Sequence, residues 1–159
     1  MKLSTKWIPP GALGTRATLE HMRLLALADK DLPEIRSLAY QLGSPENLDA
    51  FLRAAWRFKP DPPEIEFIRT PGLQVAQHEA EHFVGDCDDA ATLAACVLAA
   101  MGAPCSFQAL RLPGESEFSH VLVCCSGHYL DNLLIDPIVA VPSEPVLKAA
   151  EVMEVRVWP

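Results

Sequence analysis

Hydrophobic residues are spaced differently in the two halves of the chain. Up to about residue 56, apolar positions recur three and four residues apart, which places them on one face of a helix. This spacing predicts three helices: residues 18–28, a second from Pro33 to the stop at Gly43, and a third capped by Ser44. Their core-facing residues are expected to be Leu19, Met22, Leu25 and Ala26, then Ile35, Leu38, Ala39 and Leu42, then Leu48, Phe51, Leu52, Ala55 and Trp56.

The most apolar helix is expected to begin near Cys87 and to continue to Met101. Only Thr92 is polar between residues 90 and 101, and alanine fills the side opposite the large apolar residues, so this helix should be buried on most sides. Asp86 or Asp88 can cap its start, while Gly102 and Pro104 end it. It is too short to cross a membrane, which takes about 20 apolar residues.

Beyond this helix the pattern changes to short apolar and β-branched runs. Strands are predicted at residues 105–112, 118–125, 129–135 and 152–158, with a turn at residues 126–127. Residues 59–72 carry four prolines and are expected to be a loop or short extended pieces, and residues 73–84 one or two helical turns. Helices followed by strands indicate an α+β fold, with an antiparallel sheet against the Cys87 helix.

The chain has 159 residues, which we interpret as one domain with an extended N-terminal arm at residues 1–16, where prolines and glycines gather. The net charge is −8 and no basic run occurs, which argues against nucleic-acid binding. The N-terminus lacks the apolar stretch of a secretory signal. Five cysteines, two of them adjacent, make a poor disulfide framework, so we expect reduced thiols in the cytoplasm.

Cys87 stands where a thiol can become reactive. The N-terminus of a helix favours the thiolate, whereas Asp86 and its acidic neighbours oppose it, so a working nucleophile would need a nearby imidazolium. His120 begins one predicted strand and Asp136 ends the next, and antiparallel pairing could bring them together beside Cys87. These residues suit a Cys-His-Asp site. A small buried structural cysteine, a strand-end histidine and a simple turn at Asp136 are the alternatives.

The motifs GDCDDAATLAACVLAAMGAPC, FSHVLV and LIDP, in this order, resemble the transglutaminase-like superfamily of papain-type cysteine enzymes. GTRATLEHM and FIRTPG resemble its bacterial and phage-associated branch, and the likeness covers roughly residues 14–140. The resemblance implies a single transglutaminase-like domain with a papain-like core, in which Cys87 is the nucleophile, His120 the base and Asp136 the orienting acid. It implies a peptide or protein substrate whose peptide or amide bond is hydrolysed or transferred through a thioester.

The resemblance leaves two points open. Some relatives are inactive, so a non-catalytic binding or assembly module is the main alternative. The segment at residues 72–84 is longer and more charged than the family pattern, and Gln77 is its one weak candidate for a side-chain oxyanion donor.

A second motif competes with the first. Residues 78–82 read H-E-x-x-H, which on a helix would place His78 and His82 on one zinc, with Glu79 as general base and Asp88 as a third ligand. The surrounding pattern does not predict a long helix there, so we interpret the stretch as a solvated surface turn. We therefore expect no metal and no cofactor.

Overall fold

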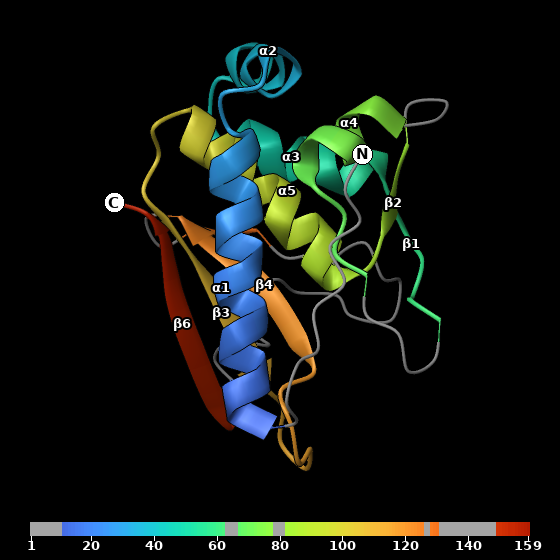
Figure 1. Ribbon diagram of the computed structural model, residues 1–159, viewed down its shortest axis with the longest axis vertical. Helices are drawn as coiled ribbons and strands as arrows, with labels where there is room; N and C mark the ends of the chain where they lie inside the picture. The colour runs from blue at the N-terminus through green and yellow to red at the C-terminus, as the bar shows by residue number, and fades with distance from the viewer. Residues whose placement is uncertain (1–10, 63–66, 78–81, 126–127, 131–148) are drawn as a thin grey trace.

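A computed structural model of the chain describes residues 11–62, 67–77, 82–125, 128–130 and 149–159. It contains both helices and an antiparallel sheet, as the sequence predicts (Figure 1). None of the helices in the described ranges is long and apolar enough to cross a membrane. The part of the expected arm at residues 1–10 lies outside these ranges.

The larger sheet has four antiparallel strands in the order β5-β4-β3-β6. They are β3 (Cys105–Arg111), β4 (His120–Cys125), β5 (His128–Leu130) and β6 (Glu151–Trp158). The predicted strands are confirmed, with β4 starting two residues later than expected and β5 one residue earlier; residues 131–135 of the predicted third strand lie outside the described residues. The register pairs Phe107 with Val123 and with Val155, which puts these apolar side chains on one face.

The helix α5 (Cys87–Ala100) packs on that face of the sheet. Residues 88–99 are all buried, which confirms a helix buried on most sides. Its C-terminal end is also as expected, because Gly102 has a positive φ of 74° that few other residues adopt. Burial of Leu93, Val97 and Leu98 makes α5 the centre of the core.

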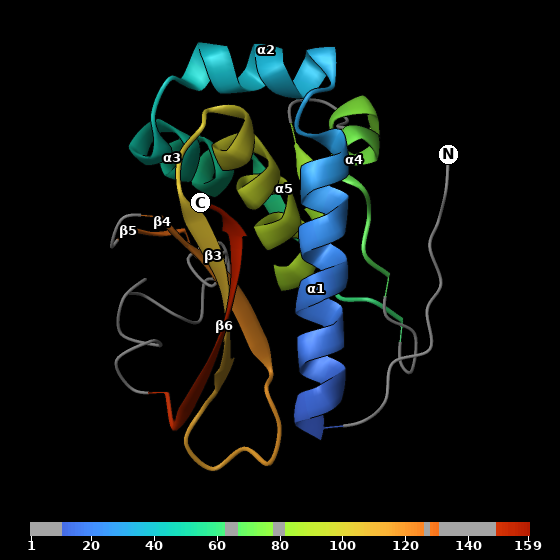
Figure 2. The ribbon, with the colours of Figure 1, turned by 60° about the vertical axis from the view of Figure 1, so that its left-hand side comes forward.

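The helix α1 (Gly11–Asp29) lies beside α5 on the same side of the sheet (Figure 2). The predicted extended arm is therefore wrong for residues 11–16, which form the first turns of α1. Glycine costs about 1 kcal/mol in a helix interior, but packing against the rest of the protein can outweigh such a propensity. Gly14 is buried, as are Leu19, Met22 and Ala26 further along α1, so the first turns of the helix are packed against the rest of the protein.

The helices α2 (Pro33–Leu42) and α3 (Pro45–Ala55) cover one end of α5 and agree with the predicted ranges. Gly43 is left-handed at the end of α2, and the Ser44 side chain accepts a hydrogen bond from the Asn47 backbone N–H, as expected of an N-cap. Trp56 is fully buried, as predicted, although it belongs to the strand that follows α3.

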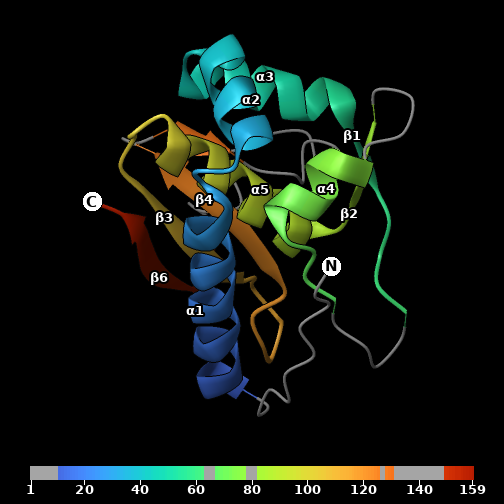
Figure 3. The ribbon, with the colours of Figure 1, turned by 45° about the horizontal axis from the view of Figure 1, so that its top comes forward.

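A second, two-stranded sheet was not predicted. The strands β1 (Trp56–Phe58) and β2 (Phe83–Gly85) pair in parallel, and α4 (Pro71–Gln77) lies against β2 and α5 (Figure 3). The ring of Trp56 stacks on that of Phe83, with their centroids 6.2 Å apart. This sheet places Gly85 directly before the start of α5.

Candidate functional site

Cys87 is the first residue of α5 and is half-buried. The preceding residue, Asp86, is the N-cap with an extended backbone, and its carbonyl oxygen accepts the first helical hydrogen bond, from the Ala90 N–H at 3.1 Å. The expected side-chain cap is absent, because the Asp86 carboxylate accepts no hydrogen bond from the first turn. The thiol therefore sits at the start of a helix whose remaining length is buried.

The backbone just before Cys87 is held from two sides. The carbonyl oxygen of Gly85 accepts hydrogen bonds from the Trp56 indole N–H at 3.1 Å and from the Lys59 backbone N–H at 2.9 Å. Both donors come from β1 or its end, so the small parallel sheet anchors the entry to α5. This anchoring holds the backbone from which α5 starts, and Cys87 is the first residue of that helix.

The first turn of α5 is also tied to the loop before α4 by an ion pair. Asp89 is fully buried and accepts two hydrogen bonds from Arg69, one from its backbone N–H at 2.7 Å and one from its guanidinium at 2.6 Å. The same guanidinium nitrogen donates to the Val84 carbonyl oxygen at 3.0 Å, and the Gln74 amide donates to the carbonyl oxygen of Asp89. Burial raises the pKa of Asp89 to about 7, against the opposing effect of Arg69.

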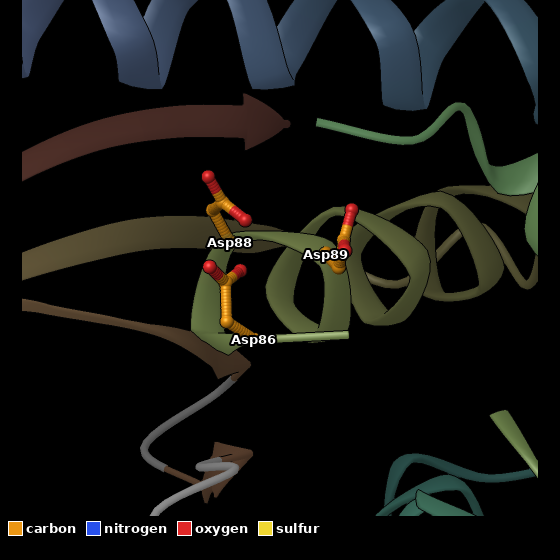
Figure 4. A group of neighbouring side chains, drawn as sticks. All are labelled: Asp86, Asp88 and Asp89. Atoms are coloured by element: carbon orange, nitrogen blue, oxygen red, sulfur yellow. The ribbon is translucent and has the colours of Figure 1, made fainter. Parts of the chain in front are cut away.

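Three carboxylates surround Cys87 in the sequence and lie close together in space. One oxygen from each of Asp86, Asp88 and Asp89 falls within 4.8 Å of the others (Figure 4). Asp89 is already engaged by Arg69, and this engagement gives it a structural role. Asp88 lines the cavity described next. The effect of these carboxylates on the Cys87 thiol stays a prediction.

Cys87 and His120 border the same cavity, which has a volume of about 330 Å³. The cavity lies between the start of α5, the N-terminal half of α1 and the beginning of β4. His120 is the first residue of β4 and is 8% exposed. Thus two of the three predicted site residues, 33 positions apart in the sequence, line one cavity.

The sheet register defines how His120 is placed. Val121 pairs with Ala109, and both belong to the core beneath α5, whereas His120 pairs with Leu110. Side chains alternate between the two faces of a strand. His120 therefore belongs to the face that α5 does not cover, and it borders the cavity at the end of the strand.

Of the other candidate residues, three lie in parts of the chain that the structure does not describe. Asp136, the predicted orienting acid, lies outside the described residues, as do His78 and Glu79 of the H-E-x-x-H motif. His82 immediately precedes β2, in extended backbone, and its Nε2 lies 3.4 Å from the Arg57 guanidinium. Gln77 lines a different pocket, beside Lys59 and Arg69, so it does not contribute to the cavity at Cys87.

All five cysteines are free, as the sequence analysis expects. Burial raises the pKa of the Cys96 thiol well above its usual range, and that of Cys105 to about 12. Cys125 is 2% exposed, whereas Cys87 and Cys124 are half-buried. The buried cysteines are consequently part of the core, and Cys87 is the cysteine that lines a cavity together with a histidine.

Comparisons with protein-family models, with curated proteins and with solved structures each gave no match. The geometry of the cavity and the sequence motifs are therefore the basis for any functional proposal.

Proposed function

We propose that the protein is a transglutaminase-like cysteine enzyme with a papain-like core, which acts on a peptide or amide bond through a thioester. One observation carries this proposal: Cys87, at the start of a buried helix, and His120, at the start of a sheet strand, line one cavity. A thiol and an imidazole from different elements on one cavity are the minimum that nucleophilic cysteine chemistry requires.

In the proposed reaction His120 takes the proton of the Cys87 thiol. The thiolate sulfur then forms a bond to the carbonyl carbon of the substrate, and the carbonyl π electrons move to the oxygen. Backbone N–H groups at the start of α5 are suitably placed to stabilise this oxyanion, since a helix N-terminus favours negative charge. When the carbon–nitrogen bond breaks, its electrons go to the amine, which receives the proton from His120, and a thioester remains on Cys87.

The thioester is resolved by a second nucleophile. Attack by water gives hydrolysis and a free acid, whereas attack by another amine gives acyl transfer. In both cases His120 takes a proton from the attacking group, the Cys87 thiolate leaves with the electrons of the broken carbon–sulfur bond, and that proton returns to the sulfur. In the proposal Asp136 orients the His120 imidazole through its second ring nitrogen. The support for a proton transfer between His120 and Cys87 is that both residues line the same cavity.

The test is alkylation by iodoacetamide at about pH 6, where an ordinary thiol with a pKa of about 8.5 is mostly protonated. Cys87 should be labelled at least about tenfold faster than Cys124, the other half-buried cysteine. His120→Ala should remove this advantage, and His82→Ala, which changes a histidine on another pocket, should leave it intact. Equal alkylation rates at Cys87 and Cys124 would contradict the proposal, as would an alkylation rate at Cys87 that is unchanged in His120→Ala.

A further inference from the structure

The cavity beside Cys87 has an uneven set of charges. Its ionisable residues, among those that the structure describes, are Cys87, Asp88, Glu117 and His120; neither lysine nor arginine occurs in this part of the lining. A thiolate on Cys87 and an imidazolium on His120 cancel one another. The exposed carboxylate of Glu117 then adds a negative charge to a lining whose described residues include no lysine or arginine.

The two carboxylates occupy different depths. Asp88 is 3% exposed and lies in the first turn of α5, where the helix N-terminus offsets part of its charge. Glu117 is exposed and lies just before β4, so its charge is the one that a ligand meets on entering. A charge at the mouth of a low-dielectric cavity acts mainly on the rate at which charged molecules enter.

The opposite wall of the cavity sets its size. The part of α1 that forms this wall is uncharged and consists of Gly11, Gly14, Thr15, Thr18, Leu19 and Met22. A volume of about 330 Å³ is at the low end for ligand sites, which run from about 300 to 1,000 Å³. A single residue or a similarly small group fits this space.

From the cavity's lining we infer that the site selects a small substrate group that is neutral or positively charged, and that Glu117 disfavours anionic substrates. This inference rests on the proposed function, because it concerns the group presented to Cys87. The inference can nevertheless be tested separately from the proposed function. When two reagents react with the same thiol, the ratio of their rates does not depend on how much of that thiol is ionised.

The experiment uses two methanethiosulfonates of similar size, one ending in trimethylammonium and one in sulfonate. In each reaction the Cys87 thiolate forms a disulfide with the sulfenyl sulfur, and methanesulfinate leaves with the electrons of the broken sulfur–sulfur bond. The rate of the cationic reagent is divided by that of the anionic one, and this ratio is normalised to N-acetylcysteinamide. We expect the normalised ratio at Cys87 to exceed 1 by roughly tenfold at low salt.

Glu117→Gln should lower that ratio by roughly threefold or more, since it removes the rim charge and keeps the shape. The matched control is Glu46→Gln, which removes an exposed carboxylate from the first turn of α3 and makes the same change in net charge. In the unaltered protein, raising the salt from about 0.02 M to about 0.5 M should reduce the ratio, because salt screens the carboxylate at the mouth.

A normalised ratio near 1 in the unaltered protein would overturn the inference, as would a ratio that falls equally in both variants. The salt series gives an independent answer should Glu117→Gln not fold, since a ratio insensitive to salt also contradicts a role for the rim charge. If Cys87 keeps its fast iodoacetamide labelling while the ratio is near 1, the proposed chemistry stands and only the charge selectivity is wrong. If Cys87 is labelled slowly by iodoacetamide while the ratio is high, the charge selectivity stands and the proposed chemistry is wrong.

Discussion

Gly85 and Asp89 are packed so closely that a Cβ atom added to Gly85 would lie 2.7 Å from the Cβ of Asp89. Gly85 ends β2 and Asp89 lies in the first turn of α5, so this contact closes the bend in which Cys87 stands. The bend needs glycine for space, because no substituent fits between the strand and the buried carboxylate. The GDCDD motif therefore has a structural explanation at its first and last positions.

We predict that Gly85→Ala destabilises the protein by about 2–4 kcal/mol, because the new methyl group must displace Asp89 or the strand. Urea unfolding measures this change. Gly114→Ala is the control: it has open space around its Cβ but a φ of 88°, so it should cost only about 1 kcal/mol of backbone strain. A cost for Gly85→Ala no larger than that of the control would contradict the packing argument.

A second prediction concerns the partner of Asp89. Arg69→Met keeps the volume and the apolar stem but removes the cation, leaving a buried carboxylate with one backbone donor from the same residue. We expect a loss of about 2–4 kcal/mol at pH 8, where Asp89 is ionised. The loss should shrink at about pH 5.5, where the protonated carboxyl does not need a cation. The free energy of unfolding, measured at pH 8 and at about pH 5.5, checks this prediction. Arg53→Met is the control, because Arg53 forms a partly exposed ion pair on α3.

The fold could be predicted to the extent that local patterns determine it. Helical spacing gave α2, α3 and α5, and apolar runs gave the strands of the larger sheet. Ser44 and Gly102 marked helix ends because their roles depend on the backbone of neighbouring residues alone. The placement of Cys87 at the start of α5 followed from the same local signals.

What escaped prediction depends on contacts between distant segments. The parallel pairing of β1 and β2 joins residues about 27 positions apart, and neither strand is long enough to show a period. The sequence around Arg69 and Asp89 does not show that the two residues form an ion pair. The available signal is an aspartate in the first turn of an apolar helix, where burial of its carboxylate would require a cation nearby. The helical start of α1 depends on its packing against α5, which local glycine content obscured.

A third prediction concerns Asp136, whose role in the site stays a prediction. Asp136→Asn should keep the fold, because the change preserves shape, but should slow Cys87 alkylation at about pH 6 by tenfold or more, as the carboxylate would no longer stabilise the His120 imidazolium. Equal unfolding midpoints in urea provide the control for folding. Asp31→Asn, at an exposed carboxylate paired with Lys30, is the matched substitution and should leave the alkylation rate unchanged. An Asp136→Asn rate equal to that of the unaltered protein would leave a Cys87–His120 dyad.

A fourth prediction tests the competing zinc motif. His82 lies in extended backbone, whereas the H-E-x-x-H chemistry requires both histidines on one helix. Protein purified without chelator should therefore contain well below one zinc per chain by elemental analysis. Stoichiometric zinc that is lost in both His78→Ala and His82→Ala would favour the metallopeptidase alternative over the cysteine chemistry.

The last prediction is the effect of pH on stability through Asp89. Its pKa is about 7 in the folded protein, and an unfolded aspartate has a pKa of about 3.9. Between about pH 4 and pH 7 the folded state holds this proton more tightly than the unfolded state does. Raising the pH in this window therefore lowers the free energy of unfolding, by up to about 1.4 kcal/mol per pH unit from this one group, and the effect levels off above about pH 7.

Other carboxyls and the histidines titrate in the same window, so the test is the difference between the unaltered protein and Asp89→Asn. Urea unfolding at about pH 4.5, 5.5, 6.5 and 7.5 gives both curves. The unaltered protein should lose stability relative to Asp89→Asn as the pH rises, since the asparagine carries no proton to release.

Because Asp89 holds the turn that carries Cys87, the same titration should loosen the start of α5 before the core unfolds. Amide hydrogen exchange at residues 87–90 should accordingly quicken towards pH 7 beyond its intrinsic pH dependence, in the unaltered protein only. Parallel stability curves for the two proteins would show that Asp89 keeps an ordinary pKa, held down by Arg69.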